Sequence, residues 1–403
     1  MKGYTQSSGS LSIPLLLLTL LLSIFLVTTS FVFFGTLLVD IAKTFNVSIG
    51  TASQIGILIN LVSLVLGFAV GALTLKFKIK SLYLSGLVFY GFGALGFYFA
   101  PNFATTLLVN VFIGIGTGMT QIMVFSLVGG LFPLEKRGST IGFIFSISFL
   151  ASVIGAPLFG RIQELAGWRP VLLWFSFPLS IICLILGLLT IPATSLEPQA
   201  KSLYKQVFTS ILHNKSAVAC LTGTTLIWIF TSIPFYAVSF YRIHFSVSPS
   251  AGGVFSAIAA VGGIFGAAIG GKLVNKCGRK VLTVVGAFIS GLFGVSFTFT
   301  PYMWVSVAFW AVSASFAALT MGALTSLILE QMPKFRAFMM SINGTFQALG
   351  SMMGLIIGGL VLNLYLNNFH LLMTIFGASN IALAIIIFLL ANDPCKTKLM
   401  RAS

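Results

Sequence analysis

Twelve apolar runs, each long enough to cross a lipid bilayer, occupy most of this chain of 403 residues. A spanning helix needs about 20 apolar residues, because the hydrocarbon core of a bilayer is about 30 Å thick. Only 7% of the residues are charged, whereas a soluble domain carries about 25%. We therefore predict an all-α integral membrane protein with twelve transmembrane helices. The runs lie at approximately 12–36, 51–75, 81–100, 104–132, 138–165, 168–191, 216–241, 248–274, 280–300, 303–331, 336–363 and 369–391.

The basic residues lie in the gaps between these runs, and their distribution predicts the orientation. Of the 22 Lys and Arg, 18 fall on the side that holds both termini. The other side holds four, namely Lys43, Arg161, Arg169 and Arg242. Cytoplasmic loops of membrane proteins are enriched in Lys and Arg, so both termini are predicted to be cytoplasmic, in a cell membrane. The net charge of +16 is thus explained by the basic cytoplasmic loops, and no nucleic-acid partner is expected.

The remaining chemistry-bearing residues are sparse and peripheral. The four cysteines are far apart and form no CxxC pair, so neither a disulfide framework nor a metal site is expected, and no cofactor. No ionisable residue falls at the expected midplane of a span, which excludes a central carboxylate proton relay. A uniporter, an exchanger, or coupling through a peripheral acid such as Asp40 all stay open.

The chain also contains an internal duplication. Residues 71–82 align with residues 271–282 at an offset of 200, with five of twelve positions identical. Pro133 and Pro333 each end a span at the same offset. We predict two pseudo-symmetric six-helix bundles, residues 1–191 and 216–403, joined by a cytoplasmic linker at 192–215. Such repeats place a binding site at their interface and permit alternating access.

These features together resemble the major facilitator superfamily. The clearest motif is Gly271-Lys-Leu-Val-Asn275-Lys-Cys-Gly278-Arg279-Lys280, similar to the family's segment after spans two and eight. Ala156-Pro157-Leu-Phe-Gly160 is similar to the antiporter motif of span five, and Asp40 resembles an acid common at the outer end of span one. The resemblance points to the drug- and metabolite-efflux branch, and implies a monomer that binds a small-molecule substrate within the bilayer.

The chain also departs from the family pattern. Leu75 and Asn275 stand where the loop motif has an acid, so the latch that this acid forms is expected to be weakened. Asn110 stands where antiporters of the family often carry Arg. These departures put proton-coupled drug antiport in doubt but leave the predicted fold unchanged.

The resemblance implies that spans one, four, seven and ten line the cavity, with further contacts from spans two and eleven, and this gives candidate site residues. The candidate substrate contacts are polar or aromatic, as expected for a neutral or weakly polar solute, although each residue could equally serve helix packing: Thr29, Asn110, Gln121, Trp228, Ser232, Tyr236, Trp310, Asn343 and Gln347. Candidate gating or coupling residues are Asp40, Gly71, Arg137, Gly155, Pro157, Gly271, Asn275, Gly278, Arg279 and Gly354. Glycines spaced by four, including Gly354, form stripes that we interpret as sliding contacts of the gates.

The leading hypothesis is a secondary transporter that exports a small organic solute. The alternative is an uptake facilitator or exchanger for a small anion or nutrient, favoured only if the outer arginines Arg161, Arg169 and Arg242 attract the solute. A non-transporting sensor is disfavoured because the largest gap between spans is only about two dozen residues. No catalytic constellation of side chains is found, so an enzyme is not expected.

Overall fold

The structure is a computed structural model that describes residues 13–132, 134–192, 211, 213–332 and 336–393. Its described residues form helices and no strands. The first half contains α1 (Ile13–Thr44), α2 (Ile49–Ala52), α3 (Gln54–Lys76), α4 (Ile79–Phe99), α5 (Phe103–Leu131), α6 (Leu134–Ala166), α7 (Arg169–Val171), the π-helical turn η1 (Leu172–Ser176) and α8 (Phe177–Thr190). The second half contains α10 (Lys215–Phe230), α11 (Ile233–His244), α12 (Pro249–Cys277), α13 (Arg279–Ser296), α14 (Met303–Gln331), α15 (Arg336–Leu364) and α16 (Phe369–Leu390).

Twelve helical segments of the described chain are long and apolar enough to cross a membrane, which confirms the expected number. The sixth comprises α7, η1 and α8, and the seventh comprises α10 and α11. The seventh span is broken at Thr231 and Ser232, directly before Pro234. Proline lacks the amide hydrogen that would bond to the carbonyl of Phe230, so the helix cannot continue regularly through this point. The protein is a multi-pass membrane protein.

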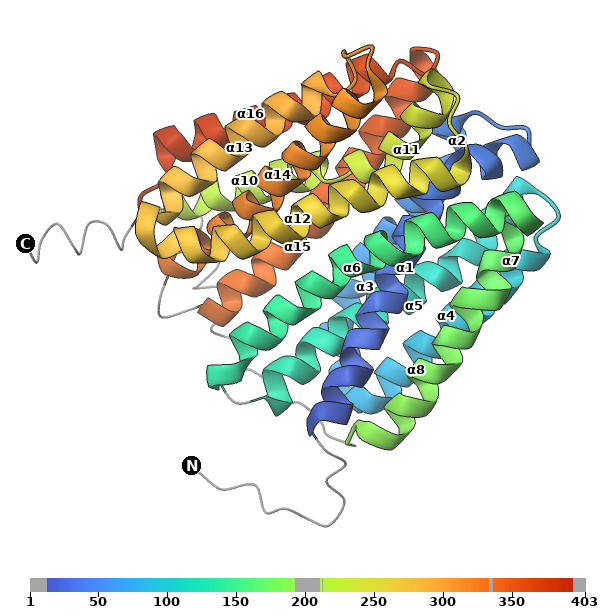
Figure 1. Ribbon diagram of the computed structural model, residues 1–403. Coiled ribbons are helices and arrows are strands. Elements are labelled where there is room, and N and C mark those ends of the chain that lie inside the picture. Colours follow the sequence, from blue (N-terminus) through green and yellow to red (C-terminus); the bar gives the residue numbers. More distant parts are fainter. Residues whose placement is uncertain (1–12, 133, 193–210, 212, 333–335, 394–403) are drawn as a thin grey trace, which may run out of the picture.

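The helices of each half pack mainly against one another, and fewer pairs join the halves. Contacts between the halves are made by α6 with α12, by α1 with α11, and by α15 with α2 and α3. Figure 1 shows the two groups of helices lying close together at the end where α2, α7 and α11 lie, and spreading apart toward the opposite end. We call the first end the closed end. It lies away from the start of α1 and the end of α16.

Local geometry repeats at the offset of 200 that the sequence shows. Asn46 and Ser246 have left-handed backbones with φ of 50° and 54°. Ser48 and Ser248 follow them as N-caps, whose hydroxyls accept hydrogen bonds from the amides of Thr51 and Ala251. Gly86 and Gly286 likewise leave room for the hydroxyls of Thr120 and Thr320. The two halves therefore have the same turns, helix caps and close glycine contacts at matching positions.

Candidate functional site

A buried ion pair joins the two halves at the closed end. Asp40 lies on the last turn of α1, which runs to Thr44 rather than ending near residue 36 as the sequence suggested. Nη2 of Arg242, on α11, donates to Oδ1 of Asp40 at 2.8 Å, and Nη1 donates to Oδ2. Each side chain is only 8% exposed. Because both charges are buried, removing either one would leave the other uncompensated, at a cost of about 3–5 kcal/mol.

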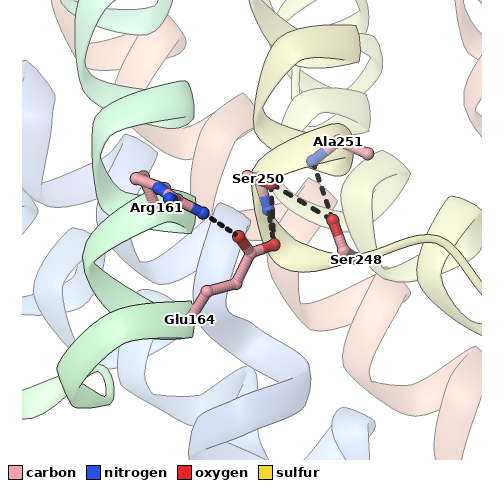
Figure 2. Close-up of polar contacts among 5 residues, drawn as sticks. All are labelled: Arg161, Glu164, Ser248, Ser250 and Ala251. Atoms are coloured by element: carbon pink, nitrogen blue, oxygen red, sulfur yellow. Dashed lines mark hydrogen bonds and ion pairs between the residues drawn. The ribbon is translucent and has the colours of Figure 1, made fainter.

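A second polar contact joins α6 to α12 (Figure 2). Oε1 of Glu164 accepts hydrogen bonds from the backbone amide of Ser250 at 3.0 Å and from its hydroxyl at 2.7 Å. Oε2 accepts from Nη1 of Arg161 at 3.3 Å. The carboxylate thus lies at the start of α12, where unpaired amides and the helix dipole favour negative charge.

A third contact joins the short helix α2 to the end of α15. The hydroxyl of Ser48 donates to Oδ1 of Asn363. The backbones approach closely here, since a Cβ at Gly50 would collide with the carbonyl oxygen of Gly359. The halves also approach closely between α6 and α12, where a Cβ at Gly160 would meet the carbonyl of Pro249. The closed end is therefore sealed by backbone contact as well as by polar pairs.

The close approach is lost toward the opposite end of the same helices. Between α3 and α15, the hydroxyl of Ser351 donates to Oδ1 of Asn60 at 3.0 Å. Gly67, Gly271 and Gly344 lie further toward that end on α3, α12 and α15. Among the described residues, no heavy atom lies within 4 Å of a Cβ placed at any of these three.

Six of the nine candidate substrate residues are buried and already bonded or packed within the protein. Asn110 donates to the carbonyl of Ile55 at 2.6 Å, and Asn343 accepts from Thr224 at 2.7 Å. The hydroxyl of Tyr236 donates to the carbonyl of Leu355 at 2.8 Å. The other three are Thr29, which bonds to the carbonyl of Leu26 in α1, Ser232, which bonds to the carbonyl of Trp228 in α10, and Trp310, which stacks against Tyr241 and Phe297.

Three candidate substrate residues keep accessible surface. Gln121 is exposed within α5, although it lies in an apolar span. Trp228, on the last turn of α10 before the break, and Gln347, on α15, are half-buried. A polar side chain that is accessible inside a span is available to a solute in a way that a bonded one is not.

The structure describes the surroundings of some candidate gating residues and not of others. The side chains of Arg137 and Asn275 and the surroundings of Gly71 lie outside what the structure describes, although all three positions are helical. Gly155 and Pro157 lie in α6, where a Cβ at Gly253 of α12 would meet Ala156 and Pro157. Gly278 joins α12 to α13 with φ of +85°, a conformation that favours glycine.

The glycine stripes of α12 and α15 face their own half, which corrects our interpretation of these two stripes as sliding contacts of the gates. A Cβ at Gly354 would collide with Ser232, and one at Gly266 with Ser315. Between the halves, α12 packs against α6 and α15 packs against α3. However, other glycines, including Gly50 and Gly160, make the closest approach between halves.

One carboxylate that the sequence gave no reason to select lies at the start of α13. Oδ2 of Asp393, which follows α16, accepts hydrogen bonds from the backbone amides of Arg279 and Lys280 at 3.0 and 3.3 Å. Arg279 also lies 3.8 Å from Glu330. Asp393 therefore provides a negative charge beside the loop motif, where Asn275 departs from the family's acid.

The comparisons with known proteins settle the family. A model of the Major Facilitator Superfamily matches residues 20–244 and 220–399. The chain belongs to the major facilitator superfamily. Its relatives in this superfamily include YbcL of Bacillus subtilis, described as an uncharacterized MFS-type transporter, which is 24% identical over 373 residues, 91% of this chain and 93% of that protein.

Two further matches bear on function and fold. The lincomycin resistance protein LmrB of Bacillus subtilis is 27% identical over 186 residues, which are 45% of this chain and only 38% of that protein. Among solved structures, a D-xylose-proton symporter matches with a TM-score of 0.77 at 15% identity, covering 94% of this chain and 98% of that one. At this identity the structural match shows the fold alone. The protein is thus a transporter of the superfamily fold.

Proposed function

We propose that the protein is a secondary transporter that exports a small organic solute by alternating access of two six-helix bundles. One observation carries the proposal: in the described chain, a buried ion pair and close backbone contacts join the halves at one end, while glycines of α3, α12 and α15 toward the other end have no close neighbour. A solute site between two bundles needs this asymmetry to face one side of the membrane at a time.

The distribution of Lys and Arg supports an orientation with both termini in the cytoplasm. With this orientation the closed end is the outer end, and the structure represents an inward-facing conformation. The relative named for lincomycin resistance supports export as the direction of transport. We propose that the transporter acts as a monomer in the cell membrane.

The residues available to a solute support a neutral or weakly polar substrate. Gln121, Trp228 and Gln347 offer amide and indole groups from three different helices. The alternative of anion uptake depends on the outer arginines, and the structure engages each of them. Arg161 bonds to Glu164, Arg242 bonds to Asp40, and Nη2 of Arg169 donates to the carbonyl of Ala100 at 2.8 Å.

Asp40 is the residue through which we propose that a proton gradient acts. Protonation would remove the charge that holds Arg242, and the outer end would lose its buried ion pair. Coupling through this pair does not require an ionisable group at the midplane of the membrane.

The proposal is tested by efflux and uptake of a panel of neutral, cationic and anionic organic solutes in proteoliposomes, with and without an imposed pH gradient. We expect transport of a neutral or weakly polar solute that responds to the gradient in the native protein and becomes indifferent to it in Asp40→Asn. Transport restricted to small anions would overturn the substrate class. Native transport that ignores the gradient would overturn coupling through Asp40.

A further inference from the structure

A groove with only apolar lining runs along the outer surface of the second half, between α13 and α16. It has a volume of about 480 Å³, and its walls include Val285, Phe288, Ile385 and Phe388. These four side chains are largely exposed, and Ile385 has 54% of its surface accessible. In a multi-pass membrane protein such a surface faces lipid, so hydrocarbon chains are its natural occupants.

A second, polar hollow adjoins this groove at the membrane surface. It has a volume of about 640 Å³ and lies between the start of α10 and the end of α16. His213, Lys215, Ser216 and Asn392 line it, and Leu389 lines both this hollow and the apolar groove. The apolar groove and the polar hollow are therefore neighbours that share Leu389 as a wall. Both lie at the end of the spans where the chain termini lie.

Lys280 lies beside one wall of the groove. Its Nζ lies 5.8 Å from the centre of the Phe388 ring, over one wall. The first half provides a direct comparison, because Lys80 and Leu188 occupy the positions 200 residues earlier. There Nζ of Lys80 donates to the carbonyl oxygen of Leu188 at 2.7 Å. The ammonium of Lys80 is thus bound to the protein backbone, whereas that of Lys280 lies against an aromatic face beside the groove.

The neighbouring carboxylates are turned toward other partners. Asp393 accepts from the backbone amides at the start of α13, and Glu330 lies beside Arg279. Lys215 lines the polar hollow and Lys280 lies beside the groove, so both place positive charge at this end of the second half.

We propose that this surface is a binding site for an anionic phospholipid of the leaflet on the side of the chain termini. One acyl chain occupies the groove between α13 and α16, and the phosphate lies in the polar hollow lined by Lys215, with Lys280 beside the groove adding positive charge. The C-terminal residues beyond 393 are the competing occupant, but they carry Lys396, Lys398 and Arg401. This segment has the same sign of charge as the pocket, so electrostatics favours the lipid phosphate.

The test measures lipid retained by the full-length protein in detergent, using native mass spectrometry with dioleoyl phosphatidylglycerol and dioleoyl phosphatidylcholine at equal mole fraction. We expect the anionic lipid to be retained about fivefold or more over the zwitterionic one, since each surface lysine favours anionic lipid by roughly that factor. The double variant Lys215→Ala/Lys280→Ala should reduce this ratio to about twofold or less. Lys80→Ala, the equivalent of Lys280, should leave it unchanged.

A second pair of variants tests the acyl-chain groove. Ile385→Trp should fill the groove and lower retention of the anionic lipid, whereas Ile185→Trp, 50% exposed at the equivalent position of the first half, should not. Equal retention of both lipids by the native protein would overturn the proposal, and so would a preference that survives in the double lysine variant. A chain ended after Asp393 should bind as the native chain does. If it gained lipid, the C-terminal segment would be the occupant and the proposal would be wrong.

Discussion

Asp40 on α1 and Arg242 on α11 are 202 residues apart in the sequence, yet their side chains form two hydrogen bonds to each other in a buried contact. They belong to different halves of the chain, so the pair can persist only while the closed end stays closed. Buried charges that lose their partner are costly, which makes this pair a strong determinant of the conformational equilibrium.

Neutralising either charge should open the closed end. A loss of about 3 kcal/mol would shift a two-state equilibrium by about 100-fold. We therefore expect Asp40→Asn to increase the rate at which a membrane-impermeant maleimide labels a cysteine placed at Ser53, which is fully buried beneath α15 in this structure. The charge swap Asp40→Arg/Arg242→Asp should restore slow labelling. Arg161→Gln removes an exposed ion pair and should change the rate little, so an effect as large as that of Asp40→Asn would contradict the assignment.

A disulfide across the closed end should stop transport. The side chains of Ser48 and Asn363 meet in a hydrogen bond, so we expect cysteines at both positions to form a disulfide on oxidation. In a background with Cys277 and Cys395 replaced by Ser, oxidation of the double variant should abolish transport, and reduction should restore it. The two single cysteine variants should stay active under both conditions. Continued transport by fully cross-linked protein would show that this end does not open during the cycle.

The glycine stripe of α15 should respond to substitution according to its packing. Gly354→Ala should lower stability by about 1–3 kcal/mol, because the added methyl group overpacks the contact with Ser232. Gly344→Ala, on the same helix, meets open space and should be neutral. Thermal unfolding monitored by size-exclusion chromatography separates the two. If Gly354→Ala is as stable as the native protein but inactive, the gating role that the sequence suggested would be favoured.

Gln121 and Asn110 both lie on α5, but we expect Gln121 to contact the solute and Asn110 to serve helix packing, so substitutions at the two positions should have different effects. Gln121 is accessible, so Gln121→Ala should raise the KM several-fold and leave the melting temperature unchanged. Asn110 is fully buried, and Asn110→Ala would leave the carbonyl of Ile55 without its bond, at a cost of about 1–3 kcal/mol. Transport kinetics and thermal stability of both variants decide the matter. A stable Asn110→Ala with an altered KM would return Asn110 to the list of solute contacts.

Most of the fold was predictable because the long apolar runs, and the repeat of positions at an offset of 200, can be seen in the sequence without knowing any contact in space. The expected tenth span, 303–331, agrees with α14, Met303–Gln331. The largest error is the end of α1, where the acid at Asp40 suggested the edge of the membrane. Asp40 does not mark that edge, because Arg242 pairs with its carboxylate inside the protein and α1 runs on to Thr44.

The site was less predictable because it depends on contacts between distant segments. Nothing near Arg242 in the sequence indicates Asp40 as its partner, and nothing near Arg279 indicates Asp393. Polar residues such as Asn110 and Gln121 look alike in sequence, and only packing distinguishes the bonded one from the accessible one. Glycine spacing showed a smooth helix face but could not show which neighbour that face contacts.

The break at Thr231 and Ser232 has a mechanical consequence for the whole cycle. Arg242 lies far along α11 from the break, about 14 Å from Ile233 at about 1.5 Å per residue. A rotation of about 10° at the break would therefore displace Arg242 by about 2 Å, which is enough to separate it from Asp40. The short helix α11 can therefore act as a lever. A small change of the backbone beside Trp228, within the membrane, would move Arg242 away from Asp40 and break the ion pair at the membrane surface.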